Sequence, residues 1–418
     1  MTGKLKKLIL AVLTVITVTT VLVACNHNDE PDPVQEEDLR TVLVYIAADN
    51  SLTSFAADDI AEMVSGFAAV DADKNNLLVY VDTQSAKPFL YQITKDSKGA
   101  VVKKVLYEYE EQNSVYPTVM AEVYNRAFSA FPAKSYGLVL WSHGDGWLPS
   151  PANISASKAS TRWFGEDKTS SSYMDISSLN TALNSAPHFD FILFDACFMQ
   201  SVEVAYELKD RADYFIGAPN EIPGPGAYYT ELVPAMFSQV NDLAATVAHG
   251  YYDYYAAKYT GQLGSNANWT MGVTVSVLKS SEVQALAAAT AAILPKYITN
   301  GSAINVSSIY SYDPRSTYFY YDLKDLIKSL VASDDQTLFS AWSDAFELAV
   351  PVHLTTDKTY SSFINGMVSM AGSSGLSSYV PRSGTYLYDG HLYSYVSLNT
   401  FYHSYAWYSA AGWSNTGW

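Results

Sequence analysis

Residues 136–147 read YGLVLWSHGDGW and residues 189–199 read FDFILFDACFM. Each segment is a short, almost unbroken apolar run, followed by His143 in the first and by Cys197 in the second. Unbroken apolar runs of this length are typical of parallel strands that are covered on both faces. Because functional groups gather at the carboxyl ends of such strands, the two segments predict that His143 and Cys197 meet at one edge of a sheet.

Other segments extend this sheet on both sides. We expect further strands at 41–47, 76–81 and 213–218, a hairpin of 89–94 with 101–107, and helices at 54–67 and from 117 onward. Strands that alternate with helices indicate an α/β sandwich with right-handed crossovers. Beyond residue 230 the pattern loosens into helices at 242–258 and 281–294, a strand at 271–278 and a tyrosine-rich end. This part predicts a continuation of the sheet and a mixed C-terminal subdomain over 231–418.

The composition supports a large folded core and excludes one class of partner. Apolar residues make up 49% of the 418 residues and charged residues only 16%, which argues against a disordered chain. The formal net charge is −17, and the chain has no basic stripe. Nucleic acid is therefore excluded as a partner, because phosphate binding needs clustered Lys and Arg. The negative net charge would attract positively charged peptides.

The N-terminus has the pattern of an export signal. Residues 1–7 carry three lysines and no acid, and residues 8–24 are small or apolar. The run ends in Leu-Val-Ala-Cys25, which resembles a bacterial lipobox and predicts a signal peptide over 1–24 and a lipid on Cys25. The alternatives are an uncleaved membrane anchor and ordinary signal cleavage. Residues 25–40 are acidic and proline-containing, so they predict a flexible tether. The resemblance is to envelope lipoproteins of Gram-negative bacteria, in the inner or outer membrane.

Neither His143 nor Cys197 is decisive alone. A single cysteine at the end of an apolar strand is usually a small buried hydrophobe, and a histidine beside glycine is usually a turn residue. Their equivalent positions on two strands make the catalytic interpretation much stronger. We also expect a helix over 198–209 that begins directly after Cys197, so that the helix N-terminus favours the thiolate.

The sequence around these residues resembles that of a known family. The two segments, together with FGED at 164–167, VEVAYELKD at 202–210 and IGAPNEIPGPG at 216–226, resemble the clostripain family of caspase-like cysteine peptidases. The resemblance is close over about 40–230 and looser beyond. It implies a caspase-like α/β/α sandwich with a mostly parallel central sheet, a catalytic core over 41–230 and the activity of a cysteine endopeptidase.

The resemblance also implies a role for each site residue. Cys197 is the nucleophile and His143 the general acid and base, in a dyad without a third member. The backbone N–H groups of Gly144 and Cys197 form the oxyanion hole. Asp195 lies at the specificity pocket and selects Arg or Lys before the scissile bond. An alternative for Asp195, from the residues themselves, is a structural acid that accepts backbone N–H bonds.

Several assignments stay open at this point. Four acids could be structural, pocket-lining or ion-binding, namely Asp145, Asp167, Glu203 and Glu221. No metal ligand is assigned and the dyad requires no cofactor, although calcium dependence occurs in the family; the sequence has no EF-hand-like loop. We expect a monomer that acts on protein or peptide substrates and reaches the membrane through its N-terminal lipid.

The interval between the two catalytic segments also suggests self-processing. Residues 148–161 are rich in Ser, Ala and Pro, which predicts an exposed loop open to cleavage. Relatives in the family mature by cleavage in this interval. Lys158 is the favoured position, ahead of Arg162 and Lys168, and the alternative is a plain surface insertion. A second function class is a non-catalytic surface lipoprotein that binds peptide or glycan on a peptidase-like scaffold; such a protein should have lost one of the two catalytic residues.

Overall fold

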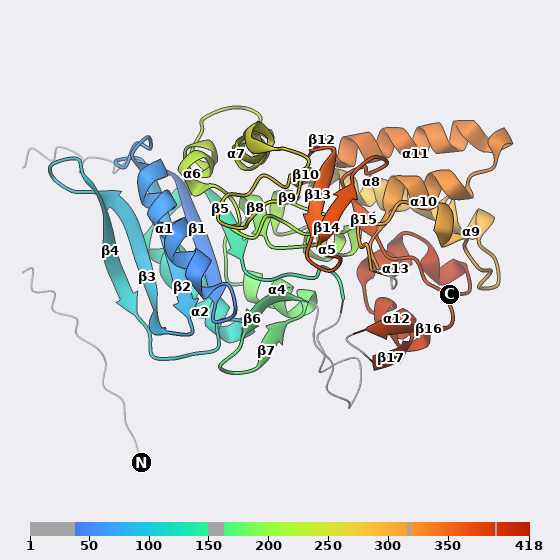
Figure 1. Ribbon diagram of the computed structural model, residues 1–418, viewed down its shortest axis with the longest axis horizontal. Helices are drawn as coiled ribbons and strands as arrows, with labels where there is room; N and C mark the ends of the chain where they lie inside the picture. The colour runs from blue at the N-terminus through green and yellow to red at the C-terminus, as the bar shows by residue number, and fades with distance from the viewer. Residues whose placement is uncertain (1–37, 149–162, 316–318, 389–390) are drawn as a thin grey trace, which may run out of the picture. The chain divides into compact units, whose positions relative to one another are not determined.

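Figure 1 shows the computed structural model, which describes residues 38–148, 163–315, 319–388 and 391–418. A nine-stranded sheet runs through it in the order β12-β10-β9-β8-β5-β1-β2-β3-β4. Its strands are β1 (Asp38–Ala48), β2 (Asn75–Thr83), β3 (Ala86–Lys95), β4 (Val101–Glu108), β5 (Ala133–Trp141), β8 (Phe189–Asp195), β9 (Ala212–Gly217), β10 (Thr274–Lys279) and β12 (Val352–Thr355). The five central strands, from β9 to β2, are parallel, whereas β10 and β12 at one end and β3 and β4 at the other are antiparallel additions.

Helices cover both faces of the sheet. One face carries α1 (Thr53–Phe67), α6 (Tyr229–Met236) and α7 (Leu243–Lys258). The other carries α2 (Pro117–Ala130), α4 (Ile176–Leu183), α5 (Val202–Leu208) and α8 (Ser280–Ala291), followed by α9 (Leu294–Tyr297), α10 (Leu323–Leu330), α11 (Gln336–Ala349), α12 (Tyr395–Tyr402) and α13 (Ala406–Ala410). Side chains of β1 alternate between the two hydrophobic cores, with Leu43 and Tyr45 in one and Val42 and Val44 in the other. The apolar runs are unbroken because both faces of each central strand are buried.

The prediction of a mostly parallel α/β/α sandwich is confirmed. The expected strands coincide with β1, β2, β5, β8 and β9, and the expected hairpin with β3 and β4. β1 begins at Asp38, three residues before the expected strand, because its first residues pair with Ala133 and Ser135 of β5. The residues beyond 230 supply β10 and β12 to the sheet, and the core on the α2 face continues without interruption to Trp413.

Among the residues that the structure describes, four small strand pairs lie outside the large sheet. They are β6 (Phe164–Asp167) with β7 (Ser172–Met174), β11 (Tyr321–Asp322) with β15 (Ser377–Ser378), β13 (Lys358–Ser361) with β14 (Gly366–Ser369), and β16 (Thr385–Tyr388) with β17 (His391–Ser394). Within the described ranges, every helix is too short or too polar to cross a bilayer. Cys25 and Lys158 lie outside the residues that the structure describes.

Candidate active site

The site lies where the order of the strands reverses direction. β1 continues through α1 to β2 on one side, whereas β5, β8 and β9 follow one another on the other side. In open α/β sheets, ligand sites form outside the carboxyl ends of the strands at such a point. Three segments leave the sheet here, with Ser51 after β1, His143 after β5 and Cys197 after β8.

Cys197 lies in a tight loop between β8 and α5. The next residue, Phe198, has a φ of +61°, a conformation that a bulky side chain rarely adopts. Its amide donates to the carbonyl of Asn220, and its ring stacks on that of Tyr320 at 4.5 Å. The expected helix start directly after Cys197 is wrong, because α5 begins only at Val202. The loop turns the chain between strand and helix, and the thiol therefore receives no help from a helix N-terminus.

The surroundings of the thiol and the imidazole favour their uncharged forms. Burial raises the pKa of Cys197 far above its ordinary value, and the charge of Glu221 adds to this effect, although Ile222 N–H donates to Sγ at 3.4 Å. Burial also lowers the pKa of His143 to about 4, and the positive charge of Lys168 contributes. At neutral pH the pair therefore rests as a neutral thiol and a neutral imidazole.

Backbone pairing with β6 holds the His143 segment. The carbonyl of His143 accepts from Gly165 N at 2.9 Å, and Asp145 N donates to the carbonyl of Trp163 at 2.7 Å. The imidazole Nε2 lies 2.8 Å from Ser51 Oγ. The ring is thus held from the β1 side, while its backbone is held by β6.

Gly144 brings the His143 and Cys197 segments into contact. A Cβ at this position would lie 2.8 Å from the carbonyl oxygen of Cys197 and 2.9 Å from the Cβ of Ala196, so a larger residue would push the segments apart. Within the described part of the chain, the backbone N–H groups of Gly144 and Cys197 have no hydrogen-bond partner. Both remain available as donors.

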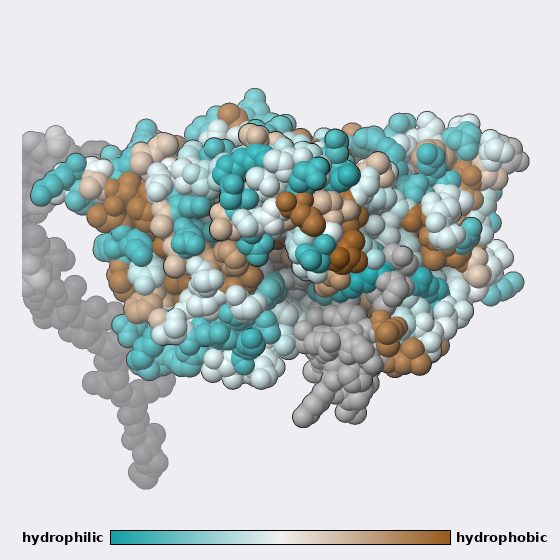
Figure 2. Space-filling view, viewed as in Figure 1, coloured by the Kyte–Doolittle hydropathy of each residue, from teal (hydrophilic) through white to brown (hydrophobic). Residues whose placement is uncertain are grey.

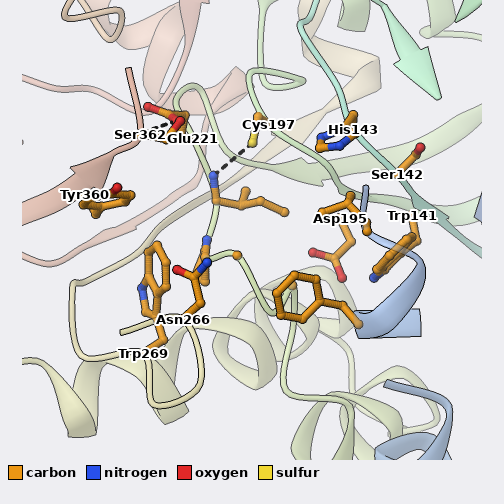
Figure 3. Close-up of a pocket in the computed structure, with 16 residues that line it drawn as sticks. Trp141, Ser142, His143, Asp195, Cys197, Glu221, Asn266, Trp269, Tyr360 and Ser362 are labelled. Carbon is orange, nitrogen blue, oxygen red and sulfur yellow. Dashed lines mark hydrogen bonds between the residues drawn. The ribbon is translucent and has the colours of Figure 1, made fainter. Parts of the chain in front are cut away.

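A cavity of about 300 Å³ opens beside these residues (Figure 3). Figure 3 shows Asp195 and Trp141 on the same side as His143, with Tyr360 and Trp269 on the opposite side. Its apolar lining is contributed mainly by Phe55, Trp141, Trp269 and Tyr360. Two carboxylates line it, Asp195 and Glu221, whereas the described lining residues include neither lysine nor arginine. The cavity suits a side chain with an apolar stem and a positive end.

Asp195 is buried at the floor of this cavity. Its Oδ1 accepts from Tyr251 Oη at 2.8 Å, and its Oδ2 accepts from Ala227 N at 3.0 Å and Tyr229 Oη at 2.9 Å. Burial raises its pKa, while the three donors oppose this rise. Asp195 therefore accepts a backbone N–H bond and also lines the cavity. Its selection of Arg or Lys stays a prediction.

Comparison with known proteins identifies the family. A model of the clostripain family matches residues 44–418. The chain belongs to the clostripain family. This membership confirms the predicted class, a cysteine peptidase. Clostripain from Hathewaya histolytica is 24% identical over 219 residues, a match that covers 46% of this chain and 41% of clostripain. The chain thus matches about two fifths of the length of that relative.

Two solved structures of C11 cysteine proteases are also similar. A secreted protease from Bacteroides thetaiotaomicron in complex with an irreversible peptide inhibitor is 46% identical, with a TM-score of 0.79 over 90% of this chain and 99% of that chain. An inactive zymogen from Parabacteroides distasonis is 30% identical, with a TM-score of 0.74 and the same shares of both chains. These structures have the same fold as this member of the clostripain family.

The remaining acids singled out in the sequence lie in different places of this clostripain-family fold. Asp167 is buried and accepts from Ser114 N at 2.8 Å, and Glu203 is buried and accepts from Tyr379 N at 2.8 Å. Both acids therefore have structural partners. Asp145 accepts from Tyr320 Oη at 2.7 Å. Across the described residues, no three His, Cys, Asp or Glu side chains are grouped to hold a metal ion.

One acid singled out in the sequence, Glu221, lines the cavity, whereas other contributors to the site carry no signal in the sequence. Glu221 reaches the cavity from the loop after β9, and Ser362 N donates to its carboxylate at 3.0 Å. Ser362 and Tyr360 belong to the β13–β14 hairpin, about 160 residues after Cys197 in the chain. Figure 2 shows apolar surface where this hairpin lies, in agreement with the exposed Phe363 and Ile364 at its tip. Only the folded chain brings this hairpin to the cavity.

Proposed function

We propose that this chain is a cysteine endopeptidase that cleaves after Arg or Lys, with Cys197 as nucleophile and His143 as general acid and base. The observation that carries the proposal is that a thiol, an imidazole and a buried carboxylate line one cavity. The buried carboxylate in the same cavity as the thiol supports a preference for a basic side chain before the scissile bond.

The resting protonation states define the first chemical step. Because thiol and imidazole are both neutral, Cys197 attacks the peptide carbonyl as its proton passes to His143. The developing oxyanion accepts hydrogen bonds from Gly144 N–H and Cys197 N–H. The imidazolium then protonates the leaving amine, the C–N bond breaks, and an acyl-enzyme remains. In the second half, water attacks the thioester carbonyl as His143 takes its proton. The C–S bond then breaks, the acid is released, and the imidazolium returns the proton to Cys197.

Specificity follows from the charge of the cavity. A guanidinium or ammonium group at the floor would meet Asp195, and Glu221 adds negative charge nearer the thiol. The aromatic walls would cover the aliphatic stem of the basic residue. The alternative of a non-catalytic binding protein is not favoured, because Cys197 and His143 are both present and line the same cavity.

The test is amide hydrolysis with peptides that carry Arg, Lys, Ala or Asp before the scissile bond. We expect cleavage after Arg and Lys only, and its loss in Cys197→Ala and in His143→Ala, with little further loss in the double variant. Asp195→Asn should lower the ratio of Arg to Ala cleavage by orders of magnitude. The ratio is the correct measure, because the three hydrogen bonds to Asp195 also support the fold and this contribution cancels. Turnover by Cys197→Ala at the wild-type rate would contradict the proposal.

We further propose that the mature protein is anchored in the cell envelope through a lipid on Cys25. The support is the basic and apolar leader followed by the lipobox-like LVAC. The relative from B. thetaiotaomicron is described as secreted, which agrees with export. Labelling with a palmitate analogue should occur in the wild type and disappear in Cys25→Ser.

Self-processing at Lys158 is the last part of the proposal. It is supported by the composition of residues 148–161 and by the existence of a zymogen form in the P. distasonis relative. Intact mass analysis should find wild type cut after Lys158 and Cys197→Ala uncut. Identical cleavage of a purified Cys197→Ala sample would contradict this part alone.

A further inference from the structure

The imidazole of His143 has a hydrogen-bond partner that the dyad does not include. Ser51 Oγ lies 2.8 Å from Nε2. Ser51 follows β1, which is the neighbour of β5 on the side opposite to β8. The strand order β8-β5-β1 therefore places Cys197 on one side of His143 and Ser51 on the other. Within the described residues, the second ring nitrogen, Nδ1, has no partner.

A buried hydrogen-bond network fixes Ser51 relative to His143. Asn50 is 1% exposed, and its side-chain amide donates to the carbonyls of Ala47 and Glu166, each at 3.0 Å. The same amide nitrogen lies 3.3 Å from Ser142 Oγ, and that hydroxyl donates to the Ala47 carbonyl at 2.7 Å. The residue before Ser51 and the residue before His143 are thus hydrogen-bonded to each other. Such a buried arrangement holds a functional pair more precisely than a surface contact alone.

We infer that Ser51 is a positioning residue for His143. The hydroxyl of Ser51 accepts a hydrogen bond from Nε2–H, and this leaves Nδ1 unprotonated and able to receive the proton of the Cys197 thiol. This inference rests on the proposed peptidase function. A general base needs an unprotonated nitrogen toward the thiol, and the hydrogen bond at the other nitrogen selects that tautomer. When Nδ1 takes the thiol proton, both nitrogens carry hydrogen, and Ser51 Oγ continues to accept from Nε2–H of the imidazolium. The proton later passes from Nδ1 to the leaving amine.

The kinetic test compares Ser51→Ala with Ser51→Thr and with Ser54→Ala. Ser54 is also exposed, lies in the first turn of α1 and has no side-chain hydrogen bond to His143, so its variant is the matched control. Ser51→Ala should lower kcat about tenfold to hundredfold with KM little changed, the range for a hydrogen bond to a charged group. Ser51→Thr keeps the hydroxyl and should restore most of kcat.

The outcomes separate this inference from the function on which it rests. A wild type that does not cleave Arg or Lys peptides would contradict both. A wild type that cleaves normally, with Ser51→Ala within twofold of its kcat, would overturn only the role of Ser51. Equal losses in Ser51→Ala and Ser51→Thr would also overturn it. A direct readout is ¹⁵N NMR of labelled histidine, in which His143 should be the Nε2–H tautomer in wild type and a mixture in Ser51→Ala.

Discussion

At the scale of single residues, the thiol and imidazole differ from a preformed ion pair. An ion pair requires a lowered pKa for Cys197 and a raised pKa for His143, whereas burial shifts both in the opposite direction. The Cys197 loop lacks a helix N-terminus, and Glu221 adds a negative charge near the sulfur. Activation must therefore accompany substrate attack, so the free enzyme should be protected from random alkylation and oxidation.

The alkylation rate of Cys197 in the free enzyme tests this state. Because the raised pKa leaves little thiolate at neutral pH, the rate with iodoacetamide should rise about tenfold per pH unit from pH 6 to pH 9. The measurement uses Cys25→Ser, in which Cys197 is the remaining cysteine of the two. Free N-acetylcysteine is the reference and should react faster at every pH below 9. A rate that is already constant between pH 5 and pH 7 would indicate an ion pair instead.

At the scale of elements, the sequence predicts strands better than the loops that complete the site. The runs that end at Trp141 and Asp195 are recognisable because both strand faces are buried, and parallel pairing then brings His143 and Cys197 together. The start of α5 is missed because apolar residues after Cys197 fit a helical pattern, while the backbone of Phe198 turns left-handed. No local pattern encodes this turn.

Local sequence patterns also do not predict which distant elements contribute residues to the site. The β13–β14 hairpin reaches the cavity only because β12 joins the sheet beside β10 and fixes where the chain emerges. Ser51 contacts His143 because β1 pairs with β5, a neighbour that lies about 90 residues away in sequence. Strand order depends on the packing of the whole sheet, and a single sequence does not reveal it.

The loop between β9 and α6 offers a prediction at this scale. Gly226 has a φ of +74°, and a Cβ there would lie 2.9 Å from Asp195 Oδ2 and 3.2 Å from Trp141 Nε1. Gly226→Ala should displace the carboxylate and lower kcat/KM for Arg and Lys peptides by tenfold or more. Gly99→Ala is the control, because Gly99 has a φ of +81° but no atom within 4 Å of the added Cβ. Gly99→Ala should lose only about 1 kcal/mol of stability through backbone strain, and its activity should be unchanged. Equal activity of the two variants would contradict a role of Gly226 in the position of the Asp195 carboxylate.

At the scale of the whole molecule, buried carboxylates lie between the helical layer and the sheet. Asp59 on α1 accepts from Trp141 Nε1 at 2.7 Å at the end of β5, next to the site. Burial, followed by the negative charge of Asp195, raises the pKa of Asp59 to about 9. Asp82 on β2 is also buried, and burial followed by the charge of Asp167 raises its pKa to about 8. The folded protein therefore binds protons at neutral pH that the unfolded chain releases.

This difference makes stability depend on pH in a defined direction. An aspartate in the unfolded chain ionises near pH 4, whereas Asp59 in the folded state keeps its proton to about pH 9. The stability contributed by Asp59 is complete below about pH 4 and is lost as the pH rises through this window. Each such group contributes a slope of up to about 1.4 kcal/mol per pH unit. Asp59→Asn retains an oxygen that accepts from Trp141 and has no proton to release, so its unfolding free energy should depend less on pH.

Urea unfolding at a series of pH values from 5 to 9 measures this dependence. The difference in unfolding free energy between Asp59→Asn and wild type should increase with pH in favour of the variant. The remaining slope should reflect the other buried acids with raised pKa values, among them Asp82 and Glu203, which both proteins keep. Asp58→Asn changes the exposed neighbour on the same helix and should alter the pH dependence far less than Asp59→Asn, because the charge of Asp58 is the smallest of the causes that raise the pKa of Asp59. If the unfolding free energy of Asp59→Asn depended on pH in the same way as that of wild type, Asp59 would already be ionised in the folded protein. Its contact with Trp141 would then join an indole N–H to a buried negative charge beside Asp195.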